Sequence, residues 1–385
     1  MIRTLAVENY RSLRRLILPL QKLTVVTGAN GSGKSSLYRS LRLLADAARN
    51  GAVAALAAEG GLPSTVWAGP EAAARSAHTG RRIPTDTRPT GPTALRLGFA
   101  GDDLGYAIDL GHPVTAAPTM FGLDPEIKRE WVWAGPVPRP SAQLADRHNS
   151  VVRLRDAGGD WVTATDALRT FDSMLTELAD PRAAPELIVV REQLRSWRFY
   201  DHLRTDAAAP ARASHIGTLT PVLAADGADL ASALQTIVEI GDATGLRQAV
   251  DHAFPGSRVE INSLAGRFEL AMRQRGLLRP LRSAELSDGT VRYLLWVAAL
   301  LTPRPPELLV LNEPETSLHQ ELLPALAALI TDAARRCQIV VVSHSPVLIA
   351  AIENATVLEL VKESGQTMLV GQGRLDEPSW TWPSR

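Results

Sequence analysis

The sequence is short of the features that mark secreted, disulfide-bonded and membrane proteins. Its 385 residues contain one cysteine, Cys337, which excludes an internal disulfide and a cysteine-built zinc site. No apolar run approaches the roughly 18 residues that a membrane-spanning helix needs. The first residues also lack the apolar stretch and cleavage site of a signal peptide. We therefore expect a cytoplasmic protein with no membrane contact.

The chain also has no net charge. Lysine and arginine together number 41, and so do aspartate and glutamate. No global field attracts nucleic acid or a membrane surface, so any such contact has to be local. Hydrophobic side chains make up 45% of the chain and charged ones 21%, so it can bury a sizeable core and is not a disordered protein.

The first part of the chain combines short strands with one long helix. Residues 2–7 and 22–27 are β-branched apolar runs that predict strands. Residues 34–58 have helical apolar spacing, which ends at Gly60-Gly61. The segment 76–93, rich in proline, glycine and threonine, predicts a mobile loop. Further expected strands are a hairpin within residues 94–110 and the segments 129–134, 150–155 and 161–165.

The second part of the chain changes from a helical to an alternating pattern. Residues 166–252 are mostly helical, with an Ala/Pro-rich interruption at 206–213, and strands follow at 257–262 and 267–273. From residue 288 onward helices and strands alternate, which implies a parallel sheet covered by helices. We expect an α/β fold of two α/β halves around an inserted antiparallel β and helical region. The predicted boundaries are an N-terminal lobe with a β-hairpin insert at 1–165, a helical insert at 166–256 and a C-terminal lobe at 257–385.

The strongest motif is a glycine-rich phosphate-binding loop. Residues 28–35 are Gly-Ala-Asn-Gly-Ser-Gly-Lys-Ser, the G-x-x-x-x-G-K-S pattern, between an apolar strand and a helix. The glycines let backbone amides wrap phosphates, and the helix presents its positive end to them. Lys34 would reach the β- and γ-phosphates of ATP, and Ser35 would ligate Mg²⁺. Ordinary turn and helix-start chemistry also explains Ser32 and Ser36. The predicted nucleotide contacts here are Asn30, Gly31, Ser32, Gly33, Lys34, Ser35 and Ser36.

Three later segments place polar residues at strand ends or at a helix start. Residues 307–315 (Glu-Leu-Leu-Val-Leu-Asn-Glu-Pro-Glu) predict a buried strand that ends in a polar cluster. A P-loop sheet delivers its metal-holding and water-activating groups from such a position. Residues 286–290 (Leu-Ser-Asp-Gly-Thr) open an apolar helix, with Ser287 or Asp288 as the N-cap. Residues 340–346 predict a strand that delivers His344 to its end.

Taken together, these segments resemble the ABC-type ATPase heads of the SMC and RecF group, and more closely the AAA-family (AAA21-like) ATPases related to RecF. The opening Asn9-Tyr-Arg-Ser-Leu13 is typical of that group. The resemblance covers residues 1–60 and 280–360. Across the middle it depends on less specific strings such as SWRFYDHLRTD and DGADLASALQTIVEIGD. It implies a P-loop fold of the ABC-ATPase head type, with ATP and Mg²⁺ as cofactors.

The resemblance also implies roles for individual residues. Glu313 would orient or deprotonate the attacking water, and His344 would sense the γ-phosphate. Ser287 and Gly289 would match the signature motif, which in this group caps the γ-phosphate of a nucleotide held by a second protomer. A homodimer would then enclose two ATP molecules and relax after hydrolysis. A DNA-linked role such as repair or genome maintenance is implied in the same way.

Two residues depart from the pattern of that group. Asn312 stands where an aspartate usually positions Mg²⁺; its amide oxygen can accept from a metal-bound water but brings no charge. We therefore expect slow hydrolysis. Asp288 replaces a small residue of the signature, and its carboxylate would repel a γ-phosphate unless it points away. The glutamine that should contact Mg²⁺ has Gln143 as its nearest candidate.

Several residues also have simpler interpretations. Glu315 and His319 could join the metal cluster, but Glu315 near a helix start is equally explained by dipole stabilisation. Arg11 touches nucleotide or is a surface charge. His344 could be only a polar strand-end residue, although its place one helix beyond Glu313 favours function.

Arginines and tryptophans outside the motifs are best explained by structure. A run of four arginines before residue 286 could meet DNA phosphates, but a solvated face is the favoured interpretation. Trp131 and Trp133 alternate on a strand and predict packing on one face. Trp380 and Trp382 lie in a Pro-rich tail that is disordered or packs back. Cys337 is expected to be a buried or partly buried, inert thiol. The four arginines are Arg273, Arg275, Arg279 and Arg282.

We predict an ATPase that acts as a nucleotide-dependent dimer, and two alternatives stay open. The first is a non-hydrolysing ATP-gated binding module, in which Asn312 makes turnover negligible. The second is the ATPase component of a defence system with a separate effector, because the residues after His344 are too few for a typical nuclease domain. The long β-containing insert disfavours a third class, the ATPase subunit of a membrane transporter.

Overall fold

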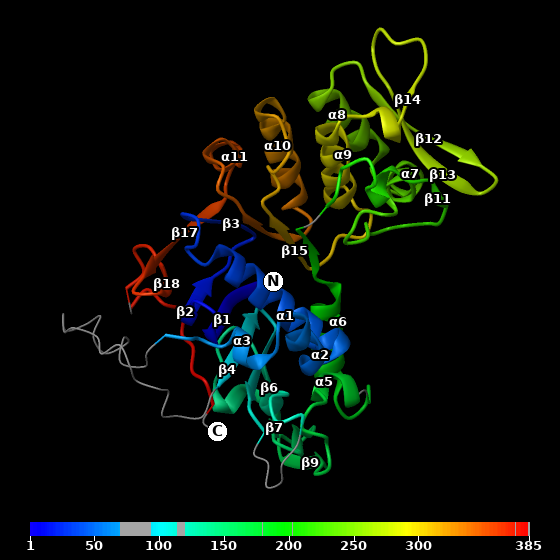
Figure 1. Ribbon diagram of the computed structural model, residues 1–385. Helices are drawn as coiled ribbons and strands as arrows, with labels where there is room; N and C mark the ends of the chain where they lie inside the picture. The colour runs from blue at the N-terminus through cyan, green and yellow to red at the C-terminus, as the bar shows by residue number, and fades with distance from the viewer. Residues whose placement is uncertain (70–93, 114–119, 179, 202, 374, 384–385) are drawn as a thin grey trace. The chain divides into compact units, whose positions relative to one another are not determined.

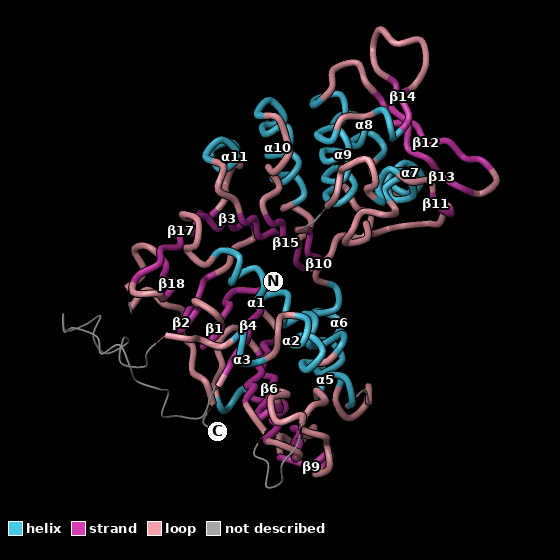
Figure 2. Tube along the Cα trace, in the orientation of Figure 1, coloured by secondary structure: helices cyan, strands magenta, loops and turns pink. Residues whose placement is uncertain are grey.

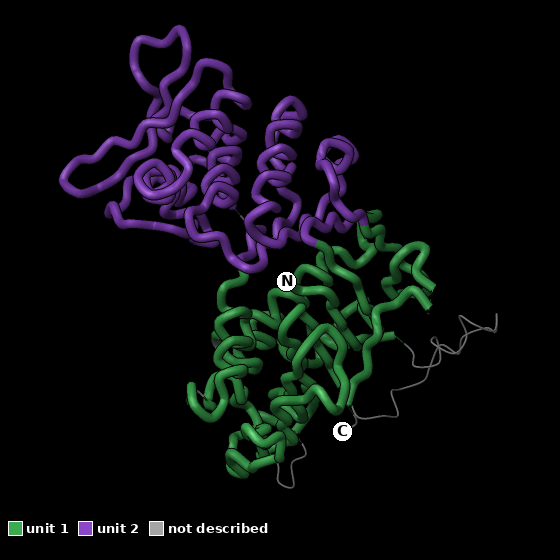
Figure 3. Tube along the Cα trace, turned by 180° about the vertical axis from the view of Figure 1, so that it is seen from behind, with its two compact units in different colours: residues 1–21, 27–197, 358–385 green, residues 22–26, 198–357 purple. Residues whose placement is uncertain are grey.

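The computed structural model describes residues 1–69, 94–113, 120–178, 180–201, 203–373 and 375–383. The expected loop at 76–93 lies outside these residues. The chain forms two compact units, coloured separately in Figure 3. Unit 1 comprises residues 1–21, 27–197 and 358–385, and unit 2 comprises residues 22–26 and 198–357.

Unit 1 is built on an eight-stranded antiparallel sheet with the order β2-β1-β4-β5-β6-β7-β8-β9 (Figure 1). The expected hairpin is β4 and β5, which pair from Leu95–Leu110 to Ala100–Gly105. The strands predicted at 2–7, 129–134, 150–155 and 161–165 are confirmed, whereas β2 and β7 were not predicted. The strands are β1 (Ile2–Tyr10), β2 (Leu13–Pro19), β4 (Leu95–Gly101), β5 (Leu104–Gly111), β6 (Glu126–Ala134), β7 (Gln143–His148), β8 (Val151–Arg155) and β9 (Trp161–Thr165).

The helices of unit 1 follow the phosphate-binding loop and the sheet. The single helix predicted over 34–58 is wrong at Gly51, whose φ of 85° and ψ of 151° cannot continue a helix. The chain instead forms two packed helices, α1 and α2, and α1 also packs on α6. The helices are α1 (Lys34–Asn50), α2 (Ala52–Ala58), α3 (Leu62–Thr65), α5 (Met174–Glu177) and α6 (Pro185–Ser196), with a 3-10 turn η1 (Pro140–Ala142).

A buried ion pair fixes α5 to the sheet of unit 1. Glu130 and Arg147 are both inaccessible to solvent, and Arg147 Nη1 lies 2.7 Å from Glu130 Oε2. Glu130 also accepts hydrogen bonds from Tyr106 Oη, Ser173 Oγ and the Met174 amide. Burial and the Glu130 charge raise the pKa of Tyr106, which therefore stays a neutral donor. Because each charge has its hydrogen bonds, the network is stable in a dry interior.

The C-terminal tail packs back on the same sheet. Trp133 and Trp131 are buried, and their rings contact Trp380 and Trp382 with centroids 5.5 and 6.1 Å apart. All three ring contacts of this cluster, including that between the two tail rings, are edge-to-face. The one-face packing expected for Trp131 and Trp133 is confirmed, and of the two alternatives for the tail the structure shows the packed one.

Unit 2 contains a parallel sheet covered by helices. Strands β10, β15, β16 and β3 lie in this order and pair in parallel (Figures 1 and 2). The alternation predicted after residue 288 is confirmed, and β16 is buried along its whole length, as parallel strands with two covered faces are. The elements are β3 (Leu23–Thr27), β10 (Arg198–Tyr200), α9 (Asp288–Leu300), β15 (Leu308–Asn312), η4 (Gln320–Leu322), α10 (Leu323–Ala333), β16 (Gln338–Val342) and α11 (Pro346–Ala351).

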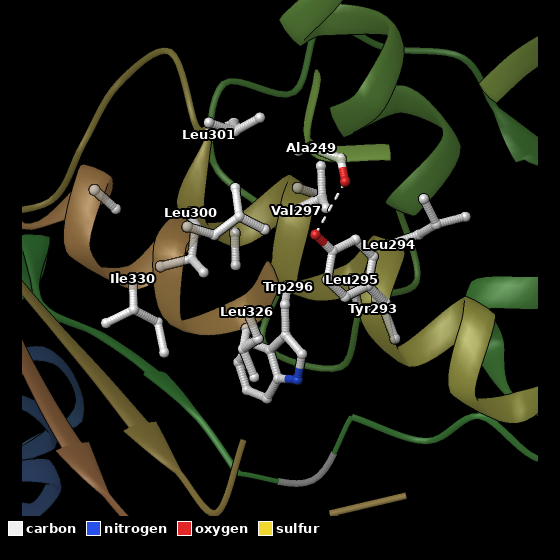
Figure 4. Packing of buried hydrophobic residues seen from close by; sticks show 14 of the residues in the cluster. Ala249, Tyr293, Leu294, Leu295, Trp296, Val297, Leu300, Leu301, Leu326 and Ile330 are labelled. Atoms are coloured by element: carbon white, nitrogen blue, oxygen red, sulfur yellow. Dashed lines mark hydrogen bonds between the residues drawn. The ribbon is translucent and has the colours of Figure 1, made fainter. Parts of the chain in front are cut away.

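Helix α9 is the centre of the core of unit 2, and almost every side chain on it is buried (Figure 4). Two polar atoms of this helix bond backbone oxygens instead of water. Tyr293 Oη donates to Ala249 O at 3.0 Å, and Trp296 Nε1 donates to Pro314 O at 3.0 Å. The second bond ties the loop after β15 to α9. Cys337 is buried as expected, and burial raises the pKa of its thiol.

The mostly helical pattern expected over 166–252 is only partly correct. Helices α5, α6, α7 (Leu230–Ile240) and α8 (Ala243–Ala253) form there, but β10 and β11 (His215–Ile216) are strands. Tertiary pairing decides these short segments, since Arg198–Tyr200 pairs with Leu309–Leu311 at the edge of the parallel sheet. Residues 210–212 form a single 3-10 turn, η2 (Pro210–Arg212).

A second, antiparallel sheet in unit 2 carries the arginine run. It consists of β11, β12 (Arg258–Leu264), β13 (Arg267–Arg273) and β14 (Leu281–Arg282), followed by η3 (Ser283–Glu285). Arg273, Arg279 and Arg282 pair with Glu260, Glu285 and Glu269 at 2.9, 2.7 and 3.1 Å. Hydrogen bonds from Arg279 and the Arg282 amide lower the pKa of Glu285 to about 2. These carboxylates offset the positive charge, as expected of a solvated face.

Candidate functional site

The phosphate-binding loop has a backbone that only glycine can supply. It joins β3 to α1, and Gly28, Gly31 and Gly33 have φ values of 142°, 80° and 108°. A Cβ atom at Gly28 would lie 2.2 Å from Leu360 O, and one at Gly33 would lie 2.1 Å from Thr367 Oγ1. Gly33 precedes α1 without a side-chain cap. The first amides of α1 are therefore available to an anion.

Lys34 is held against this loop. Its Nζ donates to Gly28 O at 2.6 Å and to Ala29 O at 3.1 Å, and the residue is 6% exposed. Ser35, in the first turn of α1, is exposed, as is Asn30. Ser32 is buried, and its Oγ has no hydrogen-bond partner among the described residues. An uncapped helix start, a lysine and open hydroxyls form a donor set that fits a nucleotide phosphate with Mg²⁺.

Two residues that sequence reasoning missed support the loop from behind. Thr367 is the second residue of β18 (Gln366–Leu369), which forms a hairpin with β17 (Thr356–Glu363). Its Oγ1 hydrogen-bonds Ser32 O and Ser12 Oγ, both at 2.8 Å, and Ser12 Oγ lies 3.5 Å from Ser36 Oγ. Ser12 is part of the opening motif, but Thr367 is 335 positions from Ser32 and carries no local signal.

The Thr367→Val variant tests this support. Valine keeps the volume of threonine and removes the hydroxyl, which leaves the buried Ser32 carbonyl without its donor. We expect the affinity for ATP to fall about 10-fold, because each lost hydrogen bond costs about 0.5–1.5 kcal/mol. Isothermal titration calorimetry measures the change. Thr163→Val on the exposed face of β9 is the matched control and should bind as the parent does.

Arg11 lies beside the opening motif but is already occupied. Its Nη2 bonds Glu59 Oε2 at 2.9 Å, and its backbone amide donates to Thr65 O at 2.7 Å. Tyr10 Oη also bonds Glu59. Burial, and then the Glu59 carboxylate, raise the pKa of Tyr10. These bonds attach the opening motif to Glu59, directly after α2, and to Thr65, the last residue of α3. They identify Arg11 as a partly buried cation paired with Glu59, and its contact with nucleotide stays a prediction.

In unit 2, the predicted metal-holding and water-activating residues gather at one edge of the parallel sheet. Asn312 pairs with Val342, and Val342 pairs with Val26, so the three strands end side by side. Glu313 follows with a left-handed φ of 48°, and its amide donates to Val342 O at 2.7 Å. Left-handed backbone at a non-glycine residue is costly and is concentrated at functional sites. The glycine loop begins two residues after Val26 in the sequence.

His344 faces both glutamates of the segment after β15. Its Nδ1 lies 3.8 Å from Glu313 Oε1 and 3.4 Å from Glu315 Oε1. About half of the His344 side chain and 43% of the Glu313 side chain are exposed to solvent. Both groups can therefore reach a substrate. The structure thus brings Asn312, Glu313 and His344 together, as their strand-end positions predicted.

Glu315 lies at the N-terminus of α11, whose N-cap is Ser345, so the helix-dipole interpretation stays open. Its Oε1 accepts hydrogen bonds from Ser343 Oγ at 2.7 Å and from the amides of His344 and Ser345 at 3.0 and 3.2 Å. The carboxylate thus shapes the turn that presents His344. Glu315 Oε2 and Asn312 Oδ1 are buried without hydrogen-bond partners among the described residues. Open acceptors of this kind suit metal-bound water.

His319 and Gln143 lie in different parts of the fold. His319 caps η4, where its Nδ1 accepts from the Glu321 amide at 3.5 Å, and it is 74% exposed. Gln143 opens β7 in unit 1 and pairs with Trp133, and its proposed metal contact stays a prediction. Within the described ranges, no cluster of three or more His, Cys, Asp and Glu side chains could hold a metal ion.

The signature segment opens α9 as expected. Of the two N-cap candidates, Ser287 is the cap: its Oγ accepts from the Thr290 amide at 3.2 Å. A Cβ atom at Gly289 would lie 3.4 Å from Ser317 O, so the start of α9 closely approaches the loop after Glu313. Gly289 and Ser317 therefore lie side by side in unit 2.

Two protein-family models match the chain. A family model, AAA_21, described as "AAA domain, putative AbiEii toxin, Type IV TA system", matches residues 141–350, more than half of the chain. The chain belongs to the AAA_21 family. A second model, described as "AAA ATPase domain", matches residues 1–63. No curated protein matches the sequence.

Solved structures share the fold of this AAA_21 chain. The SMC head bound to the C-winged helix domain of ScpA has a TM-score of 0.51 at 12% identity, covering 96% of this chain and 97% of that one. The SMC head domain from Thermotoga maritima has a TM-score of 0.50 at 14% identity, and the match covers 96% of this chain and 98% of that one. A third structure is the Pyrococcus furiosus SMC head domain with an extended coiled coil, bound to the C-terminal domain of ScpA. Its TM-score is 0.50 at 11% identity, and the match covers 96% of this chain and 95% of that one.

The expected resemblance and fold class are therefore confirmed. The AAA_21 chain is a P-loop ATPase of the AAA type, with the α/β fold of the SMC head domains. Among the residues that the structure describes, no helix is both long and apolar enough to cross a bilayer.

Proposed function

We propose that the protein binds ATP with Mg²⁺ and hydrolyses it slowly as a nucleotide-dependent homodimer. The observation that carries the proposal is the shared sheet edge, where Asn312, Glu313 and His344 end two strands beside the one that runs into the glycine loop. Residues 30–36 would hold the phosphates. A P-loop ATPase needs these two groups of residues at one nucleotide.

The proposed chemistry assigns one task to each group. Lys34 and the first amides of α1 bind the phosphates, and Ser35 with Asn312 would hold Mg²⁺, which neutralises phosphate charge when bound. Glu313 Oε accepts the proton of the attacking water, and its exposed carboxylate is free to do so. His344 donates a hydrogen bond toward the terminal phosphate. Asn312 supplies no charge, so we propose that turnover is slow.

The dimer would be completed by the signature segment. Ser287 and the free amides at the start of α9 suit the terminal phosphate of a nucleotide held by a second copy. A DNA-linked role in genome maintenance is part of the proposal because the chain shares the fold of SMC heads. A defence role with a separate effector is the second candidate, because the matched family description names a Type IV toxin–antitoxin system.

Sedimentation velocity of the Glu313→Gln variant tests the dimer. With ATP and Mg²⁺ we expect a dimer, and without nucleotide a monomer. Ser287→Arg should abolish the dimer, because a bulky cation fills the space that a second copy's nucleotide needs. A monomer under every condition, with and without duplex DNA, would rule out the composite site. A shift to a larger species only with DNA would support the genome-maintenance role over the defence role.

A further inference from the structure

The signature segment contains a carboxylate where a phosphate should bind, and the structure shows what holds it. Asp288 is the first residue of α9, next to the cap residue Ser287, and is 60% exposed. A free carboxylate at this place would repel the terminal phosphate of a nucleotide. In the described structure, Asp288 Oδ1 instead accepts from Arg212 Nη2 at 2.7 Å.

Arg212 also forms hydrogen bonds with the backbone of two other segments, at residue 205 and at residues 283–286. Its Nη1 donates to Ser283 O and, at 2.8 Å, to Leu286 O, the residue before the cap. Its Nε donates to Thr205 O at 2.8 Å, and its own carbonyl accepts from Ser283 Oγ at 2.7 Å. The side chain is only 7% exposed. One planar guanidinium therefore fixes the backbone that leads into α9.

A second arginine changes the charge balance at the same helix start. Arg292 lies one turn after Asp288 on the same face of α9 and is 9% exposed. Among the described residues it makes no hydrogen bond or ion pair, and its Nε is buried without a partner. Burial lowers the pKa of Arg292, and the Asp288 charge opposes this shift. Two guanidinium groups thus stand against one carboxylate, which leaves a net positive charge beside the helix N-terminus.

We propose that Arg212 is a positioning residue of the signature motif, which holds residues 283–288 in place and cancels the charge of Asp288 so that a nucleotide phosphate can approach. This inference rests on the proposed ATP-dependent dimer. It assigns a task to an arginine in the Ala/Pro-rich stretch that the sequence analysis treated only as an interruption between helices. Arg212 acts through Asp288 and the backbone, and it does not itself touch the nucleotide.

The experiment compares full-length variants in the Glu313→Gln background with ATP and Mg²⁺. We expect Arg212→Met to weaken dimerisation at least about 10-fold, because the loop is released and the Asp288 carboxylate becomes free. ATP binding by the monomer should not change, because it depends on the glycine loop. Arg212→Lys covers the case in which Arg212→Met fails to fold: it keeps the positive charge but loses the forked contacts to Leu286 O and Thr205 O, so it should dimerise more tightly than Arg212→Met and more weakly than the parent. Arg204→Met, which removes a cation that pairs with the exposed Asp206, is the matched control.

The double variant Arg212→Met/Asp288→Gly separates charge from general damage. Removing the carboxylate should restore most of the lost dimerisation, although the loop contacts are still missing, and a purely structural defect would not recover. A double variant as weak as Arg212→Met overturns the charge-cancelling role. Equal dimerisation of Arg212→Met and Arg204→Met overturns the whole inference.

Hydrogen exchange of the nucleotide-free monomer distinguishes this inference from the proposed function. Amides 286–290 should exchange at least about 10-fold faster in Arg212→Met than in the parent, because their tether is lost. If the parent never dimerises with ATP, the proposed dimer and the phosphate role of Arg212 both fail. Fast exchange would then still establish that Arg212 holds the loop, and unchanged exchange would overturn that as well.

Discussion

Replacing Lys34 by alanine is expected to lower the affinity for ATP by about 100-fold or more. The ammonium group lies on the glycine loop itself, bonded to the carbonyls of Gly28 and Ala29. On nucleotide binding it would exchange these neutral acceptors for phosphate oxygens. Charge-assisted hydrogen bonds contribute about 1.5–3 kcal/mol each, so the loss of one or two accounts for this change.

Calorimetric titration with ATP and Mg²⁺ measures this loss, and thermal unfolding without nucleotide checks that the fold is intact. Lys22→Ala is the matched control, because Lys22 is exposed at the opposite end of the strand that leads into the loop. It should bind ATP as the parent does. Undiminished affinity in Lys34→Ala would show that the glycine loop is not the nucleotide site.

Replacing Glu313 by glutamine should reduce steady-state phosphate release by about 100-fold to 10,000-fold, the usual contribution of a general base. Glutamine preserves the size of the side chain but cannot accept the proton of the attacking water. We expect the glutamine side chain to keep the left-handed backbone of residue 313 and its place beside His344, whose Nδ1 lies 3.8 Å from Glu313 Oε1. ATP binding should therefore persist, and only turnover should fall.

The control for this variant comes from the same strand. Glu307 is exposed at the amino end of β15, so Glu307→Gln removes an equal charge far along the strand from the reacting edge. Its turnover should match the parent. No measurable phosphate release by the parent itself would favour the non-hydrolysing, ATP-gated binding module, in which Asn312 cannot support turnover.

Local patterns predicted most of the features that depend on neighbours in sequence. The spacing of Gly28, Gly33 and Lys34 predicted the loop between a strand and a helix, and the polar residues before an apolar run predicted a cap at Ser287 or Asp288. Parallel strands 308–312 and 338–342 place their ends together, so the proximity of Glu313 and His344 followed from strand order alone. These inferences succeed because they depend on backbone geometry with a fixed period or a fixed topology.

Most of the failures share a different cause, because they depend on contacts between residues distant in sequence. Nothing local shows that Thr367 bonds Ser32, that Glu315 binds the amides of the turn after β16, or that Arg212 meets Asp288. The expected helix broke at Gly51, where helical spacing continues in the sequence but the backbone does not. Side-chain partners of polar residues were therefore the least predictable part of the site.

The bond between Thr367 and the glycine loop has a consequence for the order of events during synthesis. Translation proceeds at roughly 5–20 residues per second, so a partner 335 positions later follows the loop after about 20–70 s. During that interval the nascent chain contains the glycine loop but not yet the β17–β18 hairpin that supports it. Nucleotide bound before release from the ribosome would therefore meet an unbraced loop, and full affinity would arise only after translation has passed residue 367.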